Sequence, residues 1–221
     1  GKTVIAAFDY RRFCRQHPGQ PHRLLFIAHR EEILAQSRRC FQGILQDANF
    51  GDLFVGQHRP EQIDHLFLSI QTFHSQDWSQ KTSTGFYDYI IVDEFHHAAA
   101  DSYQQLLTYY QPQILLGLTA TPERMDGRDI LHFFGGHPTA ELRLPEAIER
   151  SMLCPFHYFG VTDTIDLSHL RWEKGGYAKS ELTNVYALQT QTARNRAALI
   201  LQCIDRYVTD AEHIHGIGFS V

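Results

Sequence analysis

A run of aliphatic residues that ends in two carboxylates constrains this chain more than any other feature. Tyr89-Ile90-Ile91-Val92 leads directly into Asp93-Glu94 and then into Phe95-His96-His97. A continuous apolar run of this kind is typical of a strand that is buried on both faces of a parallel sheet. Such a strand delivers the residues after it to the carboxyl edge of the sheet, where open α/β folds bind ligands. Two adjacent acids at that edge are either solvated or needed for a cation or a proton transfer.

Apolar runs and helical patterns alternate along the chain up to about residue 144. They predict strands over 23–28, 53–55, 66–70, 89–92 and 113–118, and helices over 1–17, 29–45 and 101–110. This alternation implies βαβ units with right-handed crossovers, and therefore a three-layer α/β domain with a mainly parallel sheet. The later part predicts a helix over 145–152, a strand over 156–161, a helix over 193–207 and a strand over 216–221. We therefore expect a first domain over 1–144 and the beginning of a second over 145–221.

Composition narrows the class of protein. The net charge is −5, which argues against a binder that relies on a general positive field but allows a local groove for phosphates. The four cysteines are scattered, so they predict neither a zinc site nor a disulfide framework and fit a reducing cytoplasm. No apolar run is long enough to span a membrane. The first residue is not a methionine and the last residues are apolar, so we expect a fragment of a longer protein.

The first three residues, Gly1-Lys2-Thr3, match the end of a phosphate-binding loop. The full motif is G-x-x-x-x-G-K-[ST] on a strand-to-helix turn, where backbone N–H groups and the lysine hold phosphates and the hydroxyl binds Mg²⁺. Only the last three positions are present here, and such a tripeptide alone is most often a frayed N-terminus. Its position at the start of a helical pattern favours the functional interpretation.

The run that ends in Asp93-Glu94 supplies the second half of such a site. Phosphate-loop enzymes hold Mg²⁺ with the loop hydroxyl and with an aspartate at the end of a hydrophobic strand, which is where Asp93 stands. Glu94 can then act as the general base that polarises the attacking water. Because the two half-motifs occur in the correct order and context, the residues predict an ATPase.

Two hydroxyl residues, Thr119 and Thr121, end the next predicted strand before Pro122. Alone, they are best explained as a strand stop. At the carboxyl edge beside Asp93 and His96 they could instead hydrogen-bond to the nucleotide site, and so couple loss of the γ-phosphate to movement of a neighbouring domain.

Five segments stand in the order of helicase motifs I, Ia, Ib/Ic, II and III. They are Gly1-Lys2-Thr3, Ala28-His29-Arg30-Glu31, Ser69-Ile70-Gln71-Thr72, Asp93-Glu94-Phe95-His96 and Thr119-Ala120-Thr121-Pro122. The chain therefore resembles superfamily 2 helicases of the DExH type (the DEAD/DEAH-box group), near the bacterial group that resembles type III restriction enzyme helicase subunits. The run from Gly117 to Arg124 looks especially like that group. The resemblance is strong over about residues 1–134 and looser beyond.

The resemblance implies two RecA-like domains with ATP in the cleft between them. By the resemblance, Gly1, Lys2 and Thr3 would bind phosphate and Mg²⁺, Asp93 would bind Mg²⁺, and Glu94 would activate water. His96, Thr119 and Thr121 would transmit the nucleotide state. Arg30 and Thr72 would contact a nucleic-acid backbone. Backbone contacts are independent of sequence, since phosphates carry no base identity. The implied function is an ATP-dependent helicase or translocase, and its preference for DNA over RNA rests on the resemblance alone.

Parts of the family pattern are missing from this sequence. They are the first part of motif I, the adenine-reading segment before it, and the later motifs whose arginines would stabilise transition-state charge. Residues 216–221 correspond to the strand that opens motif IV. We therefore expect these residues alone to hydrolyse ATP poorly or not at all, and assign the function to the whole protein.

Two other functions fit the residues. A phosphate-loop ATPase or kinase that acts on a small molecule would not be stimulated by any polynucleotide. A nucleotide-independent interaction domain that keeps the fold would retain its activity after Lys2→Ala or Glu94→Gln.

Three further groups have an ordinary structural explanation beside a functional one. His97, His213 and His215 could be metal ligands, but histidines in such positions are more often solvated. A loop that stacks on bases and contacts phosphates could be formed by Trp172, Lys174, Tyr177 and Lys179. Such a segment is more often a plain surface loop. Packing on a helix face is predicted for Tyr103, Tyr109 and Tyr110.

Overall fold

The computed structural model describes residues 1–95, 101–120, 131–161, 167–173, 176–185, 190–210, 213 and 215–218. The chain forms two compact units, Gly1–Leu142 and Arg143–Val221. Among the described residues, no helix combines the length and the apolar character needed to cross a membrane.

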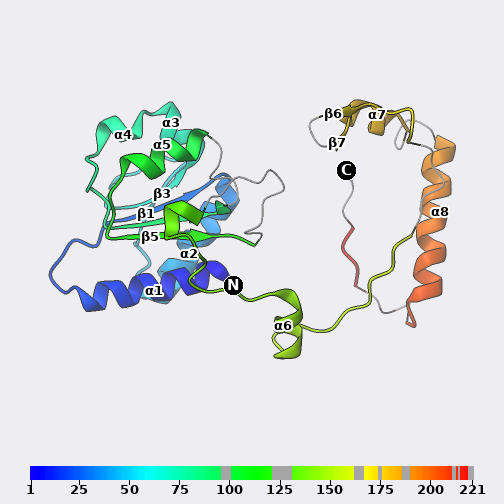
Figure 1. The fold of residues 1–221 in the computed structure, drawn as a ribbon, viewed down its shortest axis with the longest axis horizontal. Helices are drawn as coiled ribbons and strands as arrows, with labels where there is room; N and C mark the ends of the chain where they lie inside the picture. Colours follow the sequence, from blue (N-terminus) through cyan, green and yellow to red (C-terminus); the bar gives the residue numbers. More distant parts are fainter. Residues whose placement is uncertain are drawn as a thin grey trace. The chain divides into compact units, whose positions relative to one another are not determined.

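The first unit is a three-layer α/β structure (Figure 1). Five parallel strands run in the order β2-β3-β1-β4-β5; they are β1 (Leu24–Ala28), β2 (Asp52–Phe54), β3 (His65–Ser69), β4 (Tyr89–Asp93) and β5 (Ile114–Leu118). One face of the sheet is covered by α1 (Lys2–Gln16) and α2 (Glu31–Leu45), and the other by α3 (Ile70–Ser75), α4 (Trp78–Lys81) and α5 (Asp101–Tyr109). A 3₁₀ helix, η2 (Leu131–Phe134), follows. The predicted parallel α/β fold is confirmed.

Two hydrophobic cores explain why the central strands are apolar without interruption. In β4, Tyr89 and Ile91 pack with α1 and α2, whereas Ile90 and Val92 pack with the helices of the opposite face. All five residues of β4 are buried. A sheet that is covered on both faces leaves no solvent side for polar residues, so the apolar run stops only where the strand reaches the edge of the sheet.

The segment from residue 70 to 81 differs from the prediction. The strand predicted over 66–70 ends at Ser69, and two short helices, α3 and α4, follow it. The hydroxyl of Ser69 accepts a hydrogen bond from the backbone N–H of Thr72 at 3.1 Å and so caps α3. Trp78 in α4 is buried, and its indole N–H donates to the Tyr87 hydroxyl at 3.2 Å. Burial of Ile70, Phe73 and Trp78 fixes a segment whose other residues are polar.

The second unit contains little regular structure. It has α6 (Leu144–Glu149), an antiparallel pair of β6 (Trp172–Glu173) and β7 (Gly176–Tyr177), α7 (Lys179–Thr183) and α8 (Thr190–Tyr207). The predicted helices over 145–152 and 193–207 are confirmed as α6 and α8. The strand predicted over 156–161 is wrong, because these residues are exposed and pair with no other strand in the described part of the chain. Residues 216–218 are not a strand either, and 219–221 lie outside the described residues.

Candidate nucleotide site

The ends of four parallel strands bring the motif residues of the first unit to one edge of the sheet. Ala28 of β1 lies opposite Ser69 of β3, and Asp93 of β4 lies opposite Leu118 of β5. Because the strands are parallel, the segments that follow them leave the sheet at the same edge. These segments carry Arg30, Thr72, Glu94 and Thr119.

The beginning of α1 reaches the same edge. The ammonium nitrogen of Lys2 lies 3.8 Å from Oε1 of Glu94, and the two side chains are 38% and 27% exposed. An ion pair at such a partly exposed position contributes only about 0–1 kcal/mol to stability. The pairing therefore contributes little to holding the fold, and it brings an ammonium and a carboxylate group together at this edge.

Asp93 carries a carboxylate in an unfavourable place. The residue is only 6% exposed. Burial raises the pKa of Asp93, and the neighbouring charge of Glu94 raises it further. The hydrogen bond from the Glu94 backbone N–H to Asp93 Oδ1, at 2.9 Å, lowers this pKa, as do the charges of Lys2 and His29. A buried acid of this kind is relieved by a bound cation.

The residues at this edge fit a Mg²⁺ ion. Thr3, half-buried in the first turn of α1, offers a hydroxyl oxygen, and Asp93 offers carboxylate oxygens. Mg²⁺ prefers oxygen ligands and is usually held by one or two carboxylates together with substrate phosphates and water. Within the described ranges, no three His, Cys, Asp or Glu side chains cluster as a metal site would require. The donor set therefore suits a cation that arrives with a phosphate ligand.

Glu94 adopts a backbone conformation that is unusual for a residue with a side chain. Its φ angle is 52°, in the left-handed region. Strained residues of this sort cluster at active sites, where the surrounding structure holds them in place. The next residue, Phe95, is 3% exposed and packs in the core on the side of α5.

The other predicted site residues are placed as follows. Thr119 is half-buried directly after β5, next to the strand that ends in Asp93. Arg30 is exposed just before α2, and Thr72 is half-buried in α3, where its hydroxyl oxygen accepts a hydrogen bond from Ser69 at 2.7 Å. His96 and Thr121 lie outside the described residues.

Tyr103 is a neighbour of the site that sequence reasoning treated only as packing. It is 2% exposed and belongs to the core, as predicted, but its hydroxyl has no hydrogen-bond partner among the described residues. Burial raises the pKa of Tyr103 to about 12, and the charges of Asp93 and Glu94 contribute to the rise. Helical spacing could reveal that this ring is buried, but not that the charges of two acids act on its hydroxyl.

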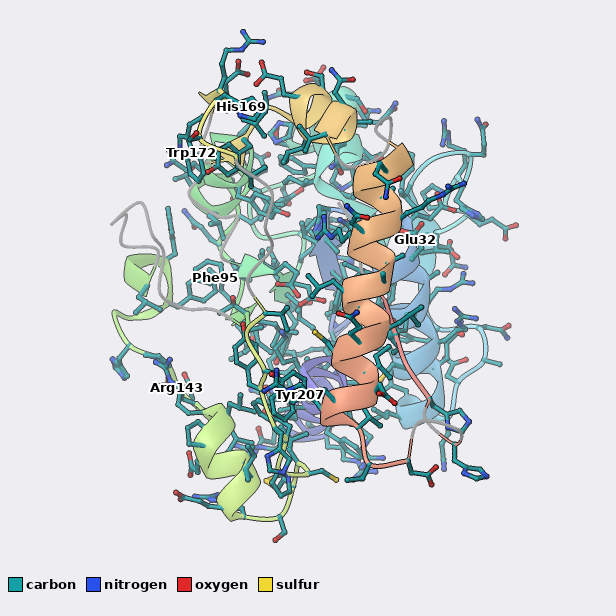
Figure 2. All side chains as sticks on the ribbon, turned by 90° about the vertical axis from the view of Figure 1, so that its right-hand side faces the viewer. Glu32, Phe95, Arg143, His169, Trp172 and Tyr207 are labelled. Atoms are coloured by element: carbon teal, nitrogen blue, oxygen red, sulfur yellow. The ribbon has the colours of Figure 1, made fainter. Side chains whose placement is uncertain are left out.

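The remaining candidates, except His97, lie in the second unit. Trp172 is 65% exposed and its ring packs edge-on against Tyr177 with centroids 4.9 Å apart. Tyr207 lies at the far end of the unit from Trp172 (Figure 2). His213 is exposed and its Nδ1 lies 3.0 Å from Oδ1 of Asp210. Lys174, His97 and the side chain of Lys179 are outside the described part of the structure.

A comparison with known protein families identifies the family of this chain. Residues 1–124, more than half of the chain, match the model of the type III restriction enzyme res subunit. The chain belongs to this family. The resemblance to DExH-type superfamily 2 helicases, drawn from five motifs, is thereby confirmed.

Curated relatives of this chain include a "51.5 kDa protein" of Lactococcus phage (isolate 7-9). It is 34% identical over 185 residues, which cover 82% of this chain and 35% of the relative. A type I restriction enzyme EcoAI endonuclease subunit of Escherichia coli is 30% identical over 99 residues, 43% of this chain and 12% of the relative. The putative ATP-dependent helicase IRC3 of Saccharomyces cerevisiae is 26% identical over 155 residues, 66% of this chain and 22% of the relative. The chain thus spans 35% or less of the length of each.

Solved structures share the fold. The Hef helicase domain of Pyrococcus furiosus superposes with a TM-score of 0.51 at 19% identity, covering 62% of this chain and 31% of that one. A nuclease-deletion mutant of the Type ISP restriction-modification enzyme LlaGI, in complex with a DNA substrate mimic, gives 0.51 at 16% identity, covering 69% and 18%. At these identities the likeness shows the fold alone, which is the RecA-like fold of helicase domains.

Proposed function

We propose that the chain is the nucleotide-binding part of an ATP-dependent helicase or translocase that moves on DNA. The observation that carries the proposal is the meeting of Lys2 and Glu94, 3.8 Å apart, beside the buried carboxylate of Asp93. A lysine, a general base and a metal-binding acid at one sheet edge are the parts that phosphoryl transfer to water requires.

Each side chain has a distinct role in this proposal. Lys2 binds the terminal phosphates of ATP and offsets their charge. Thr3 and Asp93 hold Mg²⁺, which supplies positive charge at the phosphate oxygens when it is bound. Glu94 takes a proton from the water that attacks the γ-phosphorus, while the bond from that phosphorus to the β-phosphate oxygen breaks and ADP leaves.

The contact with nucleic acid is assigned to the other strand ends. Arg30 and Thr72 would hydrogen-bond to backbone phosphates, which gives binding without sequence preference. His96, Thr119 and Thr121 would transmit the state of the nucleotide to a second RecA-like domain, which residues 145–221 begin. The choice of DNA is supported by two comparisons: LlaGI was solved with a DNA substrate mimic, and EcoAI is a restriction endonuclease.

ATP binding and hydrolysis by the whole protein test the proposal. Lys2→Ala is expected to weaken ATP binding and abolish turnover. Lys81→Ala is a matched control, since Lys81 is an exposed lysine of α4 that lies over the Trp78 ring. Duplex and single-stranded DNA are expected to raise the wild-type rate.

The alternatives predict different results. A rate that no polynucleotide changes would favour an ATPase or kinase for a small molecule. Full biological activity in both Lys2→Ala and Glu94→Gln would favour an interaction domain that does not use nucleotide.

A further inference from the structure

We infer that Phe134 is a positioning residue for hydrolysis: packed over Gly117 and against Phe95, it holds Glu94 in its strained conformation. Phe134 lies in η2, outside all five motifs. The inference rests on the proposed role of Glu94 as general base, and adds to it the device that fixes the base in place.

The backbone of Glu94 is strained, with a φ angle of 52°. The left-handed region costs a residue with a side chain roughly 1–2 kcal/mol, so some contact must hold the backbone there. The polar contacts of Glu94 include the ion pair with Lys2 at 3.8 Å and the hydrogen bond from its N–H to Asp93 at 2.9 Å. The ion pair is partly exposed and therefore weak. A stronger constraint comes from the residue that follows.

Phe95 is that constraint. It is 3% exposed, and its ring centroid lies 4.0 Å from that of Phe134 in an edge-to-face arrangement at 71°. Pairs of this geometry add about 0.5–1.5 kcal/mol beyond their burial. Figure 2 labels Phe95 on the segment that follows β4. With this ring fixed, the peptide between Glu94 and Phe95 has little freedom.

Gly117 makes the arrangement possible. A Cβ atom at this position would lie 2.8 and 2.9 Å from Cε1 and Cζ of Phe134, and 3.1 Å from Cγ of Phe95. The two rings therefore occupy the space of a side chain on β5, and only glycine leaves it free. Gly117 pairs with Val92, one residue before Asp93, so this packing lies directly beneath the catalytic edge.

The consequence is specific. A methyl group on Gly117 displaces one or both rings, releases Phe95, and allows Glu94 to leave the left-handed region. A misplacement of about 1 Å in a catalytic group can lower turnover about a hundredfold. Lys2 lies on a different element and keeps its place, so binding of ATP is retained.

The test compares kcat with the dissociation constant for ATP in the whole protein. Gly117→Ala is expected to lower kcat at least tenfold and to change ATP affinity less than twofold. Gly43→Ala is the matched control and leaves both unchanged, because nothing lies within 4 Å of a Cβ at Gly43. Phe134→Leu, which removes Cε1 and Cζ, is expected to lower kcat by a smaller factor.

The double variant Gly117→Ala with Phe134→Leu decides the matter. Since the added methyl fills the space of the lost ring atoms, kcat is expected to recover above that of Gly117→Ala alone. Wild-type kcat in Gly117→Ala, an equal loss of ATP affinity and kcat, or no recovery in the double variant would each overturn the inference. If Gly117→Ala does not fold, an unchanged kcat in Phe134→Leu overturns it. A wild-type protein without ATPase activity would instead refute the proposed function itself.

Discussion

At the scale of single residues, burial of the Asp93 carboxylate predicts how the stability of the protein depends on pH. Its pKa is raised above the ordinary value of 3.8, so the folded protein binds this proton more tightly than the unfolded chain. Stability therefore falls as the pH rises through the interval between the two pKa values, and the cost persists at neutral pH. Asp93→Asn is expected to raise the free energy of unfolding at pH 7 by about 0.5–2 kcal/mol, as is common where a functional residue is unfavourable for the fold.

Denaturant unfolding of the wild type and Asp93→Asn at several pH values checks this. In Asp93→Asn, the free energy of unfolding is expected not to fall as the pH rises just above the ordinary pKa range of carboxyl groups. The variant is also expected to lose ATP turnover. A variant that is less stable than the wild type at pH 7 would show that other interactions outweigh the burial of the charge.

A second prediction at this scale concerns Tyr103. Because its buried hydroxyl has no partner among the described residues, Tyr103→Phe should leave the free energy of unfolding unchanged or raise it by about 1 kcal/mol. The control is Tyr110→Phe, whose hydroxyl lies 2.6 Å from Thr82 Oγ1; loss of this hydrogen bond should cost about 1 kcal/mol. Urea denaturation measures both. Equal losses in the two variants would mean that the Tyr103 hydroxyl has a partner.

At the scale of elements, the cap of α3 links the fold to the proposed nucleic-acid contact. Ser69 is 3% exposed, accepts from the Thr72 N–H, and donates to the Thr72 hydroxyl. Ser69→Ala is expected to lower the free energy of unfolding by about 1 kcal/mol and to weaken DNA binding by the whole protein, because Thr72 loses two contacts that orient it. Ser69→Thr keeps the hydroxyl and should retain most of both. DNA affinity in Ser69→Ala that matches the wild type would argue against a role for Thr72.

Some of the strands and helices could be predicted from the sequence and others could not. Strand β4 is evident from sequence because burial on both faces requires every residue from Tyr89 to Val92 to be apolar. The helix α3 is not evident, because Ile70 and Phe73 are too few to display a helical period. The run over 156–161 has the composition of a strand, but a strand forms only where a partner offers hydrogen bonds.

The candidate site divides in the same way. The meeting of Lys2, Asp93 and Glu94 at one sheet edge could be predicted, because each stands at the start of a helix or at the end of a strand in a parallel α/β fold. The left-handed backbone of Glu94 and the packing of Phe134 on Gly117 could not. They depend on contacts between segments that are distant in the chain, and no local pattern records such contacts.

At the scale of the whole molecule, the proposed ATP hydrolysis site lies in a chain that belongs to the res-subunit family and spans 35% or less of the length of its curated relatives. The proposed cleft needs a second domain, so activity is a property of the whole protein. The described residues of 1–142 nevertheless bring together Lys2, Glu94 and Asp93, to which we assign phosphate binding, base catalysis and Mg²⁺ binding.

The most direct measurement of the central claim is the rate of ATP hydrolysis by the whole protein with saturating DNA, for the wild type and Glu94→Gln. Loss of a general base is expected to lower kcat by about 10²–10⁴-fold, while ATP binding is retained because Lys2 is untouched. A Glu94→Gln variant that hydrolyses ATP at the wild-type rate would contradict the account.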